Sequence, residues 1–306
     1  MRKKEKVYRG KQIRFFGKEN LLSYGMSLPY LIIFITFNIL PIFIAVLLSF
    51  TYFNMLQPPT FNGMENYINL LTNDDLFLTG LRNTLIMAVC IGPGGYILSY
   101  LMAWLINEMQ GWLRTVMTFL FYAPSISGSA YFIWTIFFSS DSYGYFNGIL
   151  MDLGITTEPI RWFQNPSYMM LLVVIVSLWT SFGSGFLTFV AGLKGVPRHL
   201  YEASMVDGVT NRWQELWYIT LPFMRPQLLF GAVMSISGAF TVGAICTALC
   251  GFPSTQYAVH TIMNHLDDYG GARYEMGYAC AISVVLTLLI IGMNYIFRKL
   301  IGKVGQ

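Results

Sequence analysis

The chain has 306 residues, of which 55% are hydrophobic and only 11% are charged, and its mean hydropathy is +0.54. Soluble domains carry roughly a quarter charged residues. The composition therefore excludes an ordinary soluble domain and favours a protein of the lipid bilayer. The formal net charge of +4 comes from basic residues in the tails and loops, which orient a membrane protein as described below. We therefore do not interpret this charge as a nucleic-acid surface and expect no nucleic-acid partner.

Six stretches without charged residues reach the length of about 20 residues that a helix needs to cross a bilayer. They cover residues 24–52, 83–107, 115–139, 167–193, 227–250 and 276–297. We expect an all-α membrane protein with a six-helix transmembrane domain, 21–298. A basic N-terminal tail, 1–20, precedes it, and a C-terminal tail, 299–306, follows it.

The first stretch contains Pro29 and Pro41, which predict a kink or a short prelude. A signal peptide is the alternative for this segment. A basic tail of about 20 residues precedes it and it lacks a small-residue cleavage site, so we expect it to be retained.

The basic residues predict the orientation of the chain. With six spans, sixteen Lys and Arg residues fall on one side, in the N-terminal tail, at Arg114, in the loop 194–226 and from Arg298 onward; only Arg82, Arg161 and Arg273 fall on the other side. Because basic residues concentrate on the inner side of a membrane, both termini and the loop 194–226 are expected in the cytoplasm of a bacterial cell. The basic tail can also contact anionic membrane lipid.

No catalytic, metal or cofactor site is indicated. The four cysteines all fall inside predicted spans, where a thiol acts as a small apolar residue: Cys90, Cys246, Cys250 and Cys280. The three histidines are interpreted as loop or interface residues rather than ligands: His199, His260 and His265. The sequence contains no serine-hydrolase elbow and no glycine–lysine phosphate loop, so we expect neither an enzyme nor an ATP site.

The centres of the predicted helices contain no ionisable residue. Carriers driven by proton or sodium gradients usually hold the coupling ion on such residues, each of which costs about 2.5–3.5 kcal/mol on insertion scales. The spans therefore favour half of a pore that an external motor opens. A channel-like protein without a motor is the alternative.

The segment 197–222 is a charged island between two apolar runs. Pro197 and Gly208 suit the start and the stop of a short helix. Asn211 can cap a second helix, with Gln214 three residues later, and Leu221-Pro222 is expected to end it. The pattern predicts a helix, a glycine turn and a second helix that form a docking element; an amphipathic surface loop is the alternative.

These residues resemble the EAA loop of ABC-importer permeases, the loop by which the membrane subunit contacts its ATPase. The resemblance implies ATPase-coupling roles for Tyr201, Glu202, Ala203, Ser204, Asp207, Gly208, Leu221 and Pro222. The chain departs from the family pattern twice. Ser204 replaces an alanine, and the stretch from Gly208 to Ile219 is one residue longer than the commonest family spacing.

Further segments extend the resemblance over nearly the whole chain. Residues 41–51, 61–84, 142–150 and 159–163 are similar, in this order, to the first of the two permease types that pair in carbohydrate importers. The resemblance implies the type I ABC-importer permease fold. It also implies a second homologous permease, a pair of ATPase subunits and an extracellular solute-binding protein as partners.

In sugar permeases such as the maltose permease, the fourth and fifth helices line the sugar pocket. The resemblance implies that a carbohydrate, most simply an oligosaccharide, passes Ser177, Ser181, Met234, Ser237 and Gly238. Trp179, Thr180 and Thr241 belong to the same two polar segments and are further candidates. Ordinary helix packing is the alternative role for small residues of this kind. Another solute, such as glycerol phosphate or a polyamine, is the alternative cargo, although a phosphorylated cargo would favour cationic groups that the spans lack.

Overall fold

The computed structural model describes residues 18–301, which fall into one unit that ends at Leu47 and another that begins at Leu48. Residues 1–17 and 302–306, most of the two predicted tails, lie outside the described residues. The predicted division into tails and a single transmembrane domain stays a prediction.

The first unit is one helical run, made of α1 (Lys18–Phe34), the π-helical turn η1 (Ile35–Ile39) and α2 (Leu40–Leu48). Proline lacks an N–H and its ring clashes with the carbonyl four residues earlier. For Pro41 that carbonyl belongs to Phe37, inside the π turn. Tyr24–Leu48 qualifies as one span. The irregularity predicted near Pro41 is therefore a π turn within this span, and no separate short segment precedes the span in the described residues.

The second unit is almost entirely helical. Two short strands, β1 (Thr51–Tyr52) and β2 (Thr60–Phe61), pair antiparallel. The helical elements that follow are α3 (Glu65–Thr72), α4 (Asp75–Asn107), α5 (Gly111–Ile126), η2 (Ala130–Phe132), α6 (Ile133–Phe137), α7 (Tyr145–Asp152), α8 (Pro166–Thr180), α9 (Ser184–Gly195), α10 (Arg198–Val206), α11 (Arg212–Glu215), η3 (Leu216–Thr220), α12 (Leu221–Phe223), α13 (Arg225–Phe240), α14 (Gly243–Cys250), η4 (Thr255–Tyr257), α15 (Ile262–Asp267), η5 (Asp268–Ala272) and α16 (Met276–Ile301).

Three stretches of the described chain are long enough and apolar enough to cross a membrane, namely 24–48, α4 and most of α16. Three bent pairs also qualify if each counts as one span. They are α5 with η2 and α6, bent by 91°, α8 with α9, bent by 43°, and the run α11–α12 with α13, bent by 82°. The described residues are thus compatible with six spans.

The fifth predicted span, 227–250, is wrong in detail. The helix α13 ends at Phe240, and α14 begins only at Gly243. Thr241 has φ −104° and ψ 19°, values outside the α-helical range, and its hydroxyl donates to the carbonyl of Gly238 at 3.0 Å. A hydroxyl that binds the chain's own carbonyl competes with the helix, so an apolar run of full length is here two helices.

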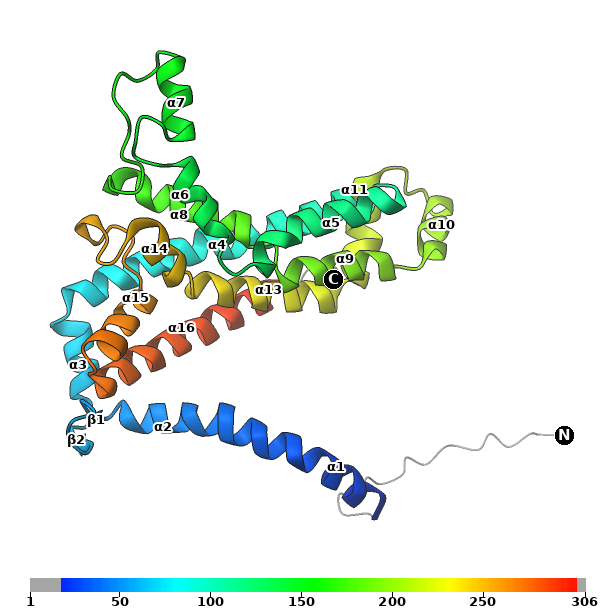
Figure 1. Ribbon diagram of the computed structural model, residues 1–306. Helices are drawn as coiled ribbons and strands as arrows, with labels where there is room; N and C mark the ends of the chain where they lie inside the picture. The colour runs from blue at the N-terminus through cyan, green and yellow to red at the C-terminus, as the bar shows by residue number, and fades with distance from the viewer. Residues whose placement is uncertain (1–17, 302–306) are drawn as a thin grey trace. The chain divides into compact units, whose positions relative to one another are not determined.

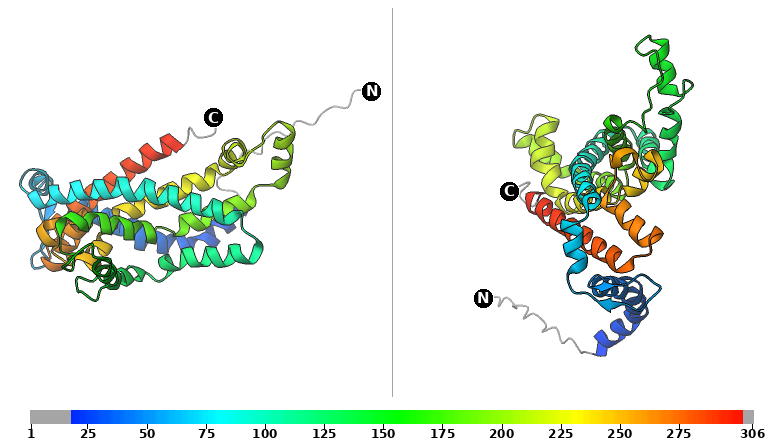
Figure 2. Two further views of the ribbon diagram at one scale, coloured as in Figure 1. Left: turned by 90° about the horizontal axis from the view of Figure 1, so that it is seen from above. Right: turned by 90° about the vertical axis from the view of Figure 1, so that its left-hand side faces the viewer.

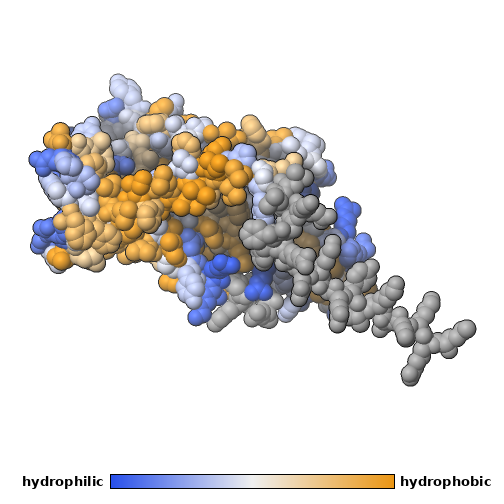
Figure 3. Space-filling model, turned by 90° about the horizontal axis from the view of Figure 1, so that it is seen from below, coloured by the Kyte–Doolittle hydropathy of each residue, from blue (hydrophilic) through white to orange (hydrophobic). Residues whose placement is uncertain are grey.

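Helices α4, α9, α13 and α16 run alongside one another in the second unit (Figures 1 and 2). The elements α10 and α11 lie at one end of this unit, and α3, α15 and the strand pair lie at the opposite end (Figure 1). Apolar side chains cover much of the face in Figure 3, and the hydrophilic residues lie mainly at its margins. Such a surface suits contact with lipid or with other apolar helices.

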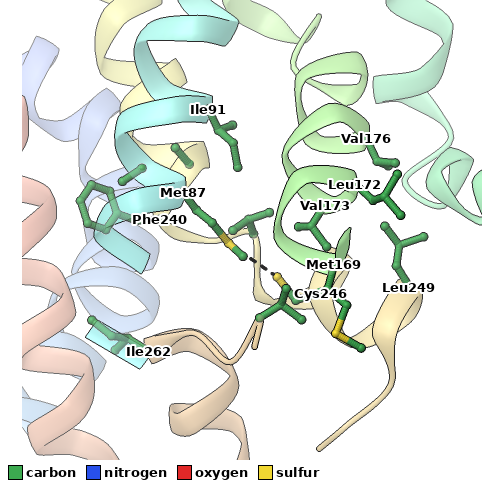
Figure 4. Close-up of a cluster of buried hydrophobic side chains, with 14 of the residues drawn as sticks. Met87, Ile91, Met169, Leu172, Val173, Val176, Phe240, Cys246, Leu249 and Ile262 are labelled. Atoms are coloured by element: carbon green, nitrogen blue, oxygen red, sulfur yellow. Dashed lines mark hydrogen bonds between the residues drawn. The ribbon is translucent and has the colours of Figure 1, made fainter. Parts of the chain in front are cut away.

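Two hydrophobic clusters hold the second unit together, and α4 contributes to both. One cluster includes Met87 and Ile91 of α4 with residues of α8, α13, α14 and α16. In Figure 4 the Cys246 thiol points at the sulfur of Met87, 3.9 Å away. Cys246 is buried to 2% exposure and serves as a small apolar residue, as expected. The other cluster joins the later part of α4, from Tyr100, to α9 and to Leu216.

At the end opposite α10, a buried polar network connects three elements. The ring of His265 lies 3.0 Å from a carboxylate oxygen of Asp74, and the Tyr278 hydroxyl donates to the same oxygen at 2.9 Å. The rings of His260 and His265 contact through nitrogens 3.2 Å apart. These histidines are therefore packing residues between α4, α15 and α16, and no group of three possible metal ligands occurs in residues 18–301.

Burial and the neighbouring His265 lower the pKa of His260 to about 4. Burial also lowers the pKa of His265, although Asp74 acts in the opposite direction. For Asp74, burial alone would raise the pKa, but the hydrogen bond from the Phe77 N–H and the contact with His265 lower it below its usual value.

These directions predict an acid-sensitive fold. The pKa of His260 is 6.5 in the unfolded chain and about 4 in the folded protein. Below pH 6.5 the unfolded chain therefore binds a proton that the folded protein does not, and the free energy of unfolding decreases as the pH falls toward about 4. Asp74 titrates below that window. We expect the thermal midpoint of the purified protein to drop between about pH 7 and about pH 4.5, and His260→Gln to flatten the drop. His199→Gln, at an exposed position, is the control and should leave the profile unchanged. An equal slope in all three proteins would contradict the assignment.

Candidate functional site

The predicted docking element forms a helix, a glycine turn and a second helix. Pro197 has φ −66° and ψ 134° and precedes α10 as its N-cap, one position earlier than expected. The helix ends in Gly208, whose φ of +93° is a left-handed conformation that side chains rarely adopt. The N–H of Val209 then donates to the carbonyl of Ser204 at 3.0 Å. This bond satisfies a carbonyl that the end of the helix leaves open.

The start of the second helix is as predicted. The side chain of Asn211 accepts from the Gln214 N–H at 2.9 Å, and the Gln214 side chain accepts from the N–H of Thr210 at 2.9 Å. The helix ends one residue after the predicted Leu221-Pro222, since α11 continues through η3 and α12 to Phe223. The helical conformation is interrupted at Met224, which has φ −83° and ψ 8°.

The π turn η3 offers a place for the extra residue that the family resemblance implies in this stretch. The N–H of Leu221 donates to the carbonyl of Leu216, five residues earlier. A π turn holds one residue more than the α-helical turn it replaces. The stretch from Gly208 to Ile219 is one residue longer than the commonest spacing, and the turn absorbs that residue while Leu216 and Thr220 stay buried.

One contact joins the two helices of the docking element, and two contacts fasten the element to α4 and the residue after it. The hydroxyls of Tyr201 in α10 and Thr220 in η3 lie 3.0 Å apart. Arg212 pairs with Glu215 at 2.8 Å and with Glu108, just after α4, at 3.4 Å. The ring of Trp213 lies 5.3 Å from that of Trp104 in α4. The first contact thus joins α10 to η3, and the other two join α11 to the end of α4.

The predicted coupling residues differ in accessibility. Four are exposed, namely Glu202, Ala203, Asp207 and Gly208, and three are half-buried, namely Tyr201, Leu221 and Pro222. Ser204 is only 8% exposed, and its hydroxyl donates to the carbonyl of Tyr201 at 2.7 Å, so Ser204 shapes the element from inside.

Two exposed residues at the tip were missed from the sequence. Met205 is 59% and Val206 is 88% exposed. An apolar pair at the end of a short polar helix is the signal that could have revealed them, since exposed apolar groups beside polar ones are typical of contact surfaces.

The predicted substrate-pathway residues converge on a cavity of about 280 Å³ between α4, α8, α13 and α14. Six of the eight line it: Ser177, Thr180, Ser181, Met234, Gly238 and Thr241. Trp179 does not, because its ring packs edge-on against Trp134 at 5.6 Å. Ser237 does not either, and it accepts a hydrogen bond from Asn294 of α16 at 3.2 Å.

The polar groups of this cavity are hydroxyls. Thr180 and Ser181 donate to backbone carbonyls at 3.1 and 2.7 Å, so their oxygens remain acceptors toward the cavity. Ser235, which the sequence reading missed, donates to the carbonyl of Gly92 at 3.0 Å and also lines the cavity. The hydroxyl of Ser177 is buried without a partner among the described residues. No lining residue is charged, so the walls suit a neutral, hydroxyl-rich solute.

Comparisons with known proteins agree with this architecture. Residues 95–304 match the family of binding-protein-dependent transport system inner membrane components. The chain belongs to this family. It is 31% identical to the probable ABC transporter permease protein YesP of Bacillus subtilis (strain 168) over 289 residues, which are 92% of this chain and 91% of that protein. The arabinooligosaccharides transport system permease protein AraP of the same organism is 29% identical over 290 residues, 94% of this chain and 91% of that protein.

A solved structure shows the same fold. A bacterial alginate ABC transporter, in complex with an alginate pentasaccharide-bound periplasmic protein, contains a chain that matches with a TM-score of 0.74 and 25% identity. The match covers 94% of this chain and 98% of that chain. The expected permease fold of an ABC importer is confirmed, and the chain is an inner-membrane transport component.

The π turn makes a testable prediction. Removal of Tyr218, which is 74% exposed, should convert η3 into an α-helical turn and preserve the register on both sides. Removal of Val233, an exposed residue of α13, should rotate the later residues of α13 by about 100° about the helix axis. We expect the first deletion to keep a cooperative thermal transition near that of the parent protein and the second to abolish it. Loss of folding in both variants would show that η3 does not hold an inserted residue.

Proposed function

We propose that this chain is one permease subunit of an ATP-driven carbohydrate importer, with an oligosaccharide as its cargo. The proposal rests on two features that occur together. A helix–turn–helix docking element lies at one end of the unit, and an uncharged, hydroxyl-lined cavity lies beside the helices that the element would move. In this proposal a separate ATPase pair supplies the energy, and a second homologous permease completes the pathway. An extracellular binding protein delivers the sugar.

The lining of the cavity favours sugar over the alternative cargos. A phosphorylated or acidic solute needs cationic partners when it leaves water, and the cavity offers none. A polyamine would need carboxylates, which are also absent from its walls. The similarity to a permease for arabinooligosaccharides supports a neutral carbohydrate.

The proposed orientation places the docking element in the cytoplasm. The uneven distribution of basic residues supports this orientation. The binding protein then approaches the opposite end, which carries the strand pair, α3 and α15. Both termini lie on the cytoplasmic side in this arrangement, in the membrane of a bacterial cell.

The mechanism follows from the contacts of α10. When ATP closes the motor, it pushes the exposed face around Glu202 and Gly208. Because the Tyr201 and Thr220 hydroxyls join α10 to η3, the push reaches α12 and α13 without being absorbed by a flexible loop. The helix α13 carries Met234 and Gly238 of the cavity wall, so movement of the docking element changes the cavity.

The coupling role is tested at Gly208. A side chain in a left-handed conformation costs about 1–2 kcal/mol, and it would also enter the proposed ATPase contact. We expect Gly208→Val to abolish uptake of an arabinose oligosaccharide by the assembled transporter while the permease stays inserted. Glu202→Ala should weaken uptake less, since an exposed charged contact contributes about 1 kcal/mol or less.

The matched control is Gly195→Val. Gly195 lies at the end of α9, has no left-handed φ, and would meet no neighbouring atom within 4 Å if it carried a Cβ. Normal uptake by the Gly208→Val protein, or equal loss in both glycine variants, would contradict a specific coupling role.

The pathway is tested at Gly238. No atom lies within 4 Å of a Cβ built at this position, so a larger side chain can enter the cavity without a direct clash. We expect Gly238→Trp to block uptake while ATP hydrolysis by the assembled transporter persists. Gly292→Trp in α16, equally open but away from the cavity, is the control. Unchanged uptake by Gly238→Trp would exclude this cavity from the route.

A further inference from the structure

A second cavity, of about 350 Å³, lies beside the docking element and apart from the proposed sugar pathway. Its walls come from the end of α4, the start of α5, the end of α9 and the docking element. The lining residues are Trp104, Asn107, Glu108, Arg114, Leu193, Lys194, Val196, Arg198, Tyr201, Arg212, Glu215, Leu216 and Thr220.

The charges of this cavity do not balance. Four cationic side chains face two carboxylates, and Arg212 pairs with both carboxylates, Glu215 at 2.8 Å and Glu108 at 3.4 Å. Within the part of the chain that the structure describes, no carboxylate lies within ion-pairing distance of Lys194 or Arg198. The cavity therefore has an excess of two positive charges.

Arg114 adds a fixed donor to this excess. Its Nη2 donates to the carbonyls of Asn107 at 2.7 Å and Met109 at 3.0 Å, which holds the guanidinium in place. Its Nε is buried and has no hydrogen-bond partner among the described residues. A buried donor without a partner is costly, so an anion that accepted this bond would be stabilised.

Exposed aromatic residues mark the level of this cavity relative to the membrane. Trp213 and Trp217 are each 58% exposed and Tyr218 is 74% exposed, and all three lie on the α11–η3 segment that forms one wall. Exposed Trp and Tyr concentrate at the headgroup level of a bilayer. The cationic cavity thus lies where phospholipid phosphates are abundant.

We propose that this cavity binds the phosphate of an anionic phospholipid, with Lys194, Arg198 and Arg114 as its cationic partners. These residues belong to α9, α10 and α5, so one bound headgroup braces the docking element against the transmembrane helices. The inference rests on the proposed function in one respect, because the proposed orientation decides that the lipid comes from the cytoplasmic leaflet. Free phosphate or a phosphorylated metabolite shares the chemistry, but the surrounding indoles favour a ligand that is itself held in the interface.

The test measures lipid binding to the full-length permease in detergent, by native mass spectrometry with phosphatidylglycerol and phosphatidylcholine. A cation near a membrane surface contributes about 1 kcal/mol to the binding of an anionic lipid, which is about fivefold in affinity. We expect the double variant Lys194→Gln/Arg198→Gln to bind phosphatidylglycerol about 25-fold more weakly and to bind phosphatidylcholine as the parent does. Arg114 is left intact, because it also holds two carbonyls.

The matched control is Arg298→Gln/Lys299→Gln. These two exposed cations lie at the end of α16 and do not line the cavity, so their removal should leave phosphatidylglycerol binding unchanged. Equal weakening in both double variants would show a diffuse attraction and overturn the proposal. Equal affinity of the parent protein for the two lipids would overturn it as well.

Two further measurements distinguish the lipid from two alternative ligands of the cavity, a soluble phosphate and a protein partner. Inorganic phosphate and glycerol phosphate, added as competitors, should not displace the lipid at comparable concentrations; displacement would assign the cavity to a soluble phosphate. ATPase attachment is then measured in nanodiscs of phosphatidylcholine alone. If the Lys194→Gln/Arg198→Gln variant loses attachment there, the cations contact protein and the lipid proposal fails. Because lipid binding is measured without transport, a failure of the proposed function does not affect this result.

Discussion

The hydrogen bond between the hydroxyls of Tyr201 and Thr220 is the contact on which the rest of the site depends. A docking helix can transmit a push only if it moves as one body with the helices behind it. The bond joins α10 to η3 across the glycine turn, and η3 leads through α12 into α13. The proposed coupling depends on this bond because the contacts of Arg212 and Trp213 with Glu108 and Trp104 hold α11 and not α10.

The need to avoid charge inside the membrane shapes the second site. Hydroxyl groups can bind a solute and yet be buried at low cost, because each can donate to a nearby backbone carbonyl. Thr180, Ser181 and Ser235 all do so. In the proposed function their oxygens accept hydrogen bonds from the solute. The walls of the cavity carry no charged side chain.

Local side-chain chemistry was readable from the sequence, whereas three-dimensional context was not. The cap at Asn211 and the glycine stop at Gly208 depend on a few adjacent residues, and both are confirmed. The predicted stop at Leu221-Pro222 lies one residue before the observed end at Phe223, but the π turn η3 that precedes it was not predicted. Proline at the second position of α12 is tolerated there, since its missing N–H falls at a place where the ladder is already altered.

Helical periodicity explains which of the proposed pathway residues line the cavity. Positions 177, 180 and 181 lie on one face of α8, and positions 234 and 238 lie on one face of α13, because residues three or four apart are neighbours on a helix. Trp179 is rotated by about 200° from Ser177 and meets Trp134 instead. Ser235 could have been inferred from its spacing of three to Gly238. The pathway segments were chosen for their polar composition, which identifies the helices but not the face that each presents.

The packing of α4 relates the two sites to each other. Its contacts divide at the run Gly92-Pro93-Gly94-Gly95, since Met87 and Ile91 belong to one hydrophobic cluster and the residues from Tyr100 onward belong to the other. Glycine and proline together are where a long helix bends most readily. The Ser235 hydroxyl binds the Gly92 carbonyl at this point, and Ile91 lines the cavity of about 280 Å³. The docking element contacts the end of α4 through Glu108 and Trp104. In the proposed mechanism, a motion imposed at that end would reach the Gly-Pro-Gly-Gly run beside the cavity, where a bend in α4 would change the cavity walls.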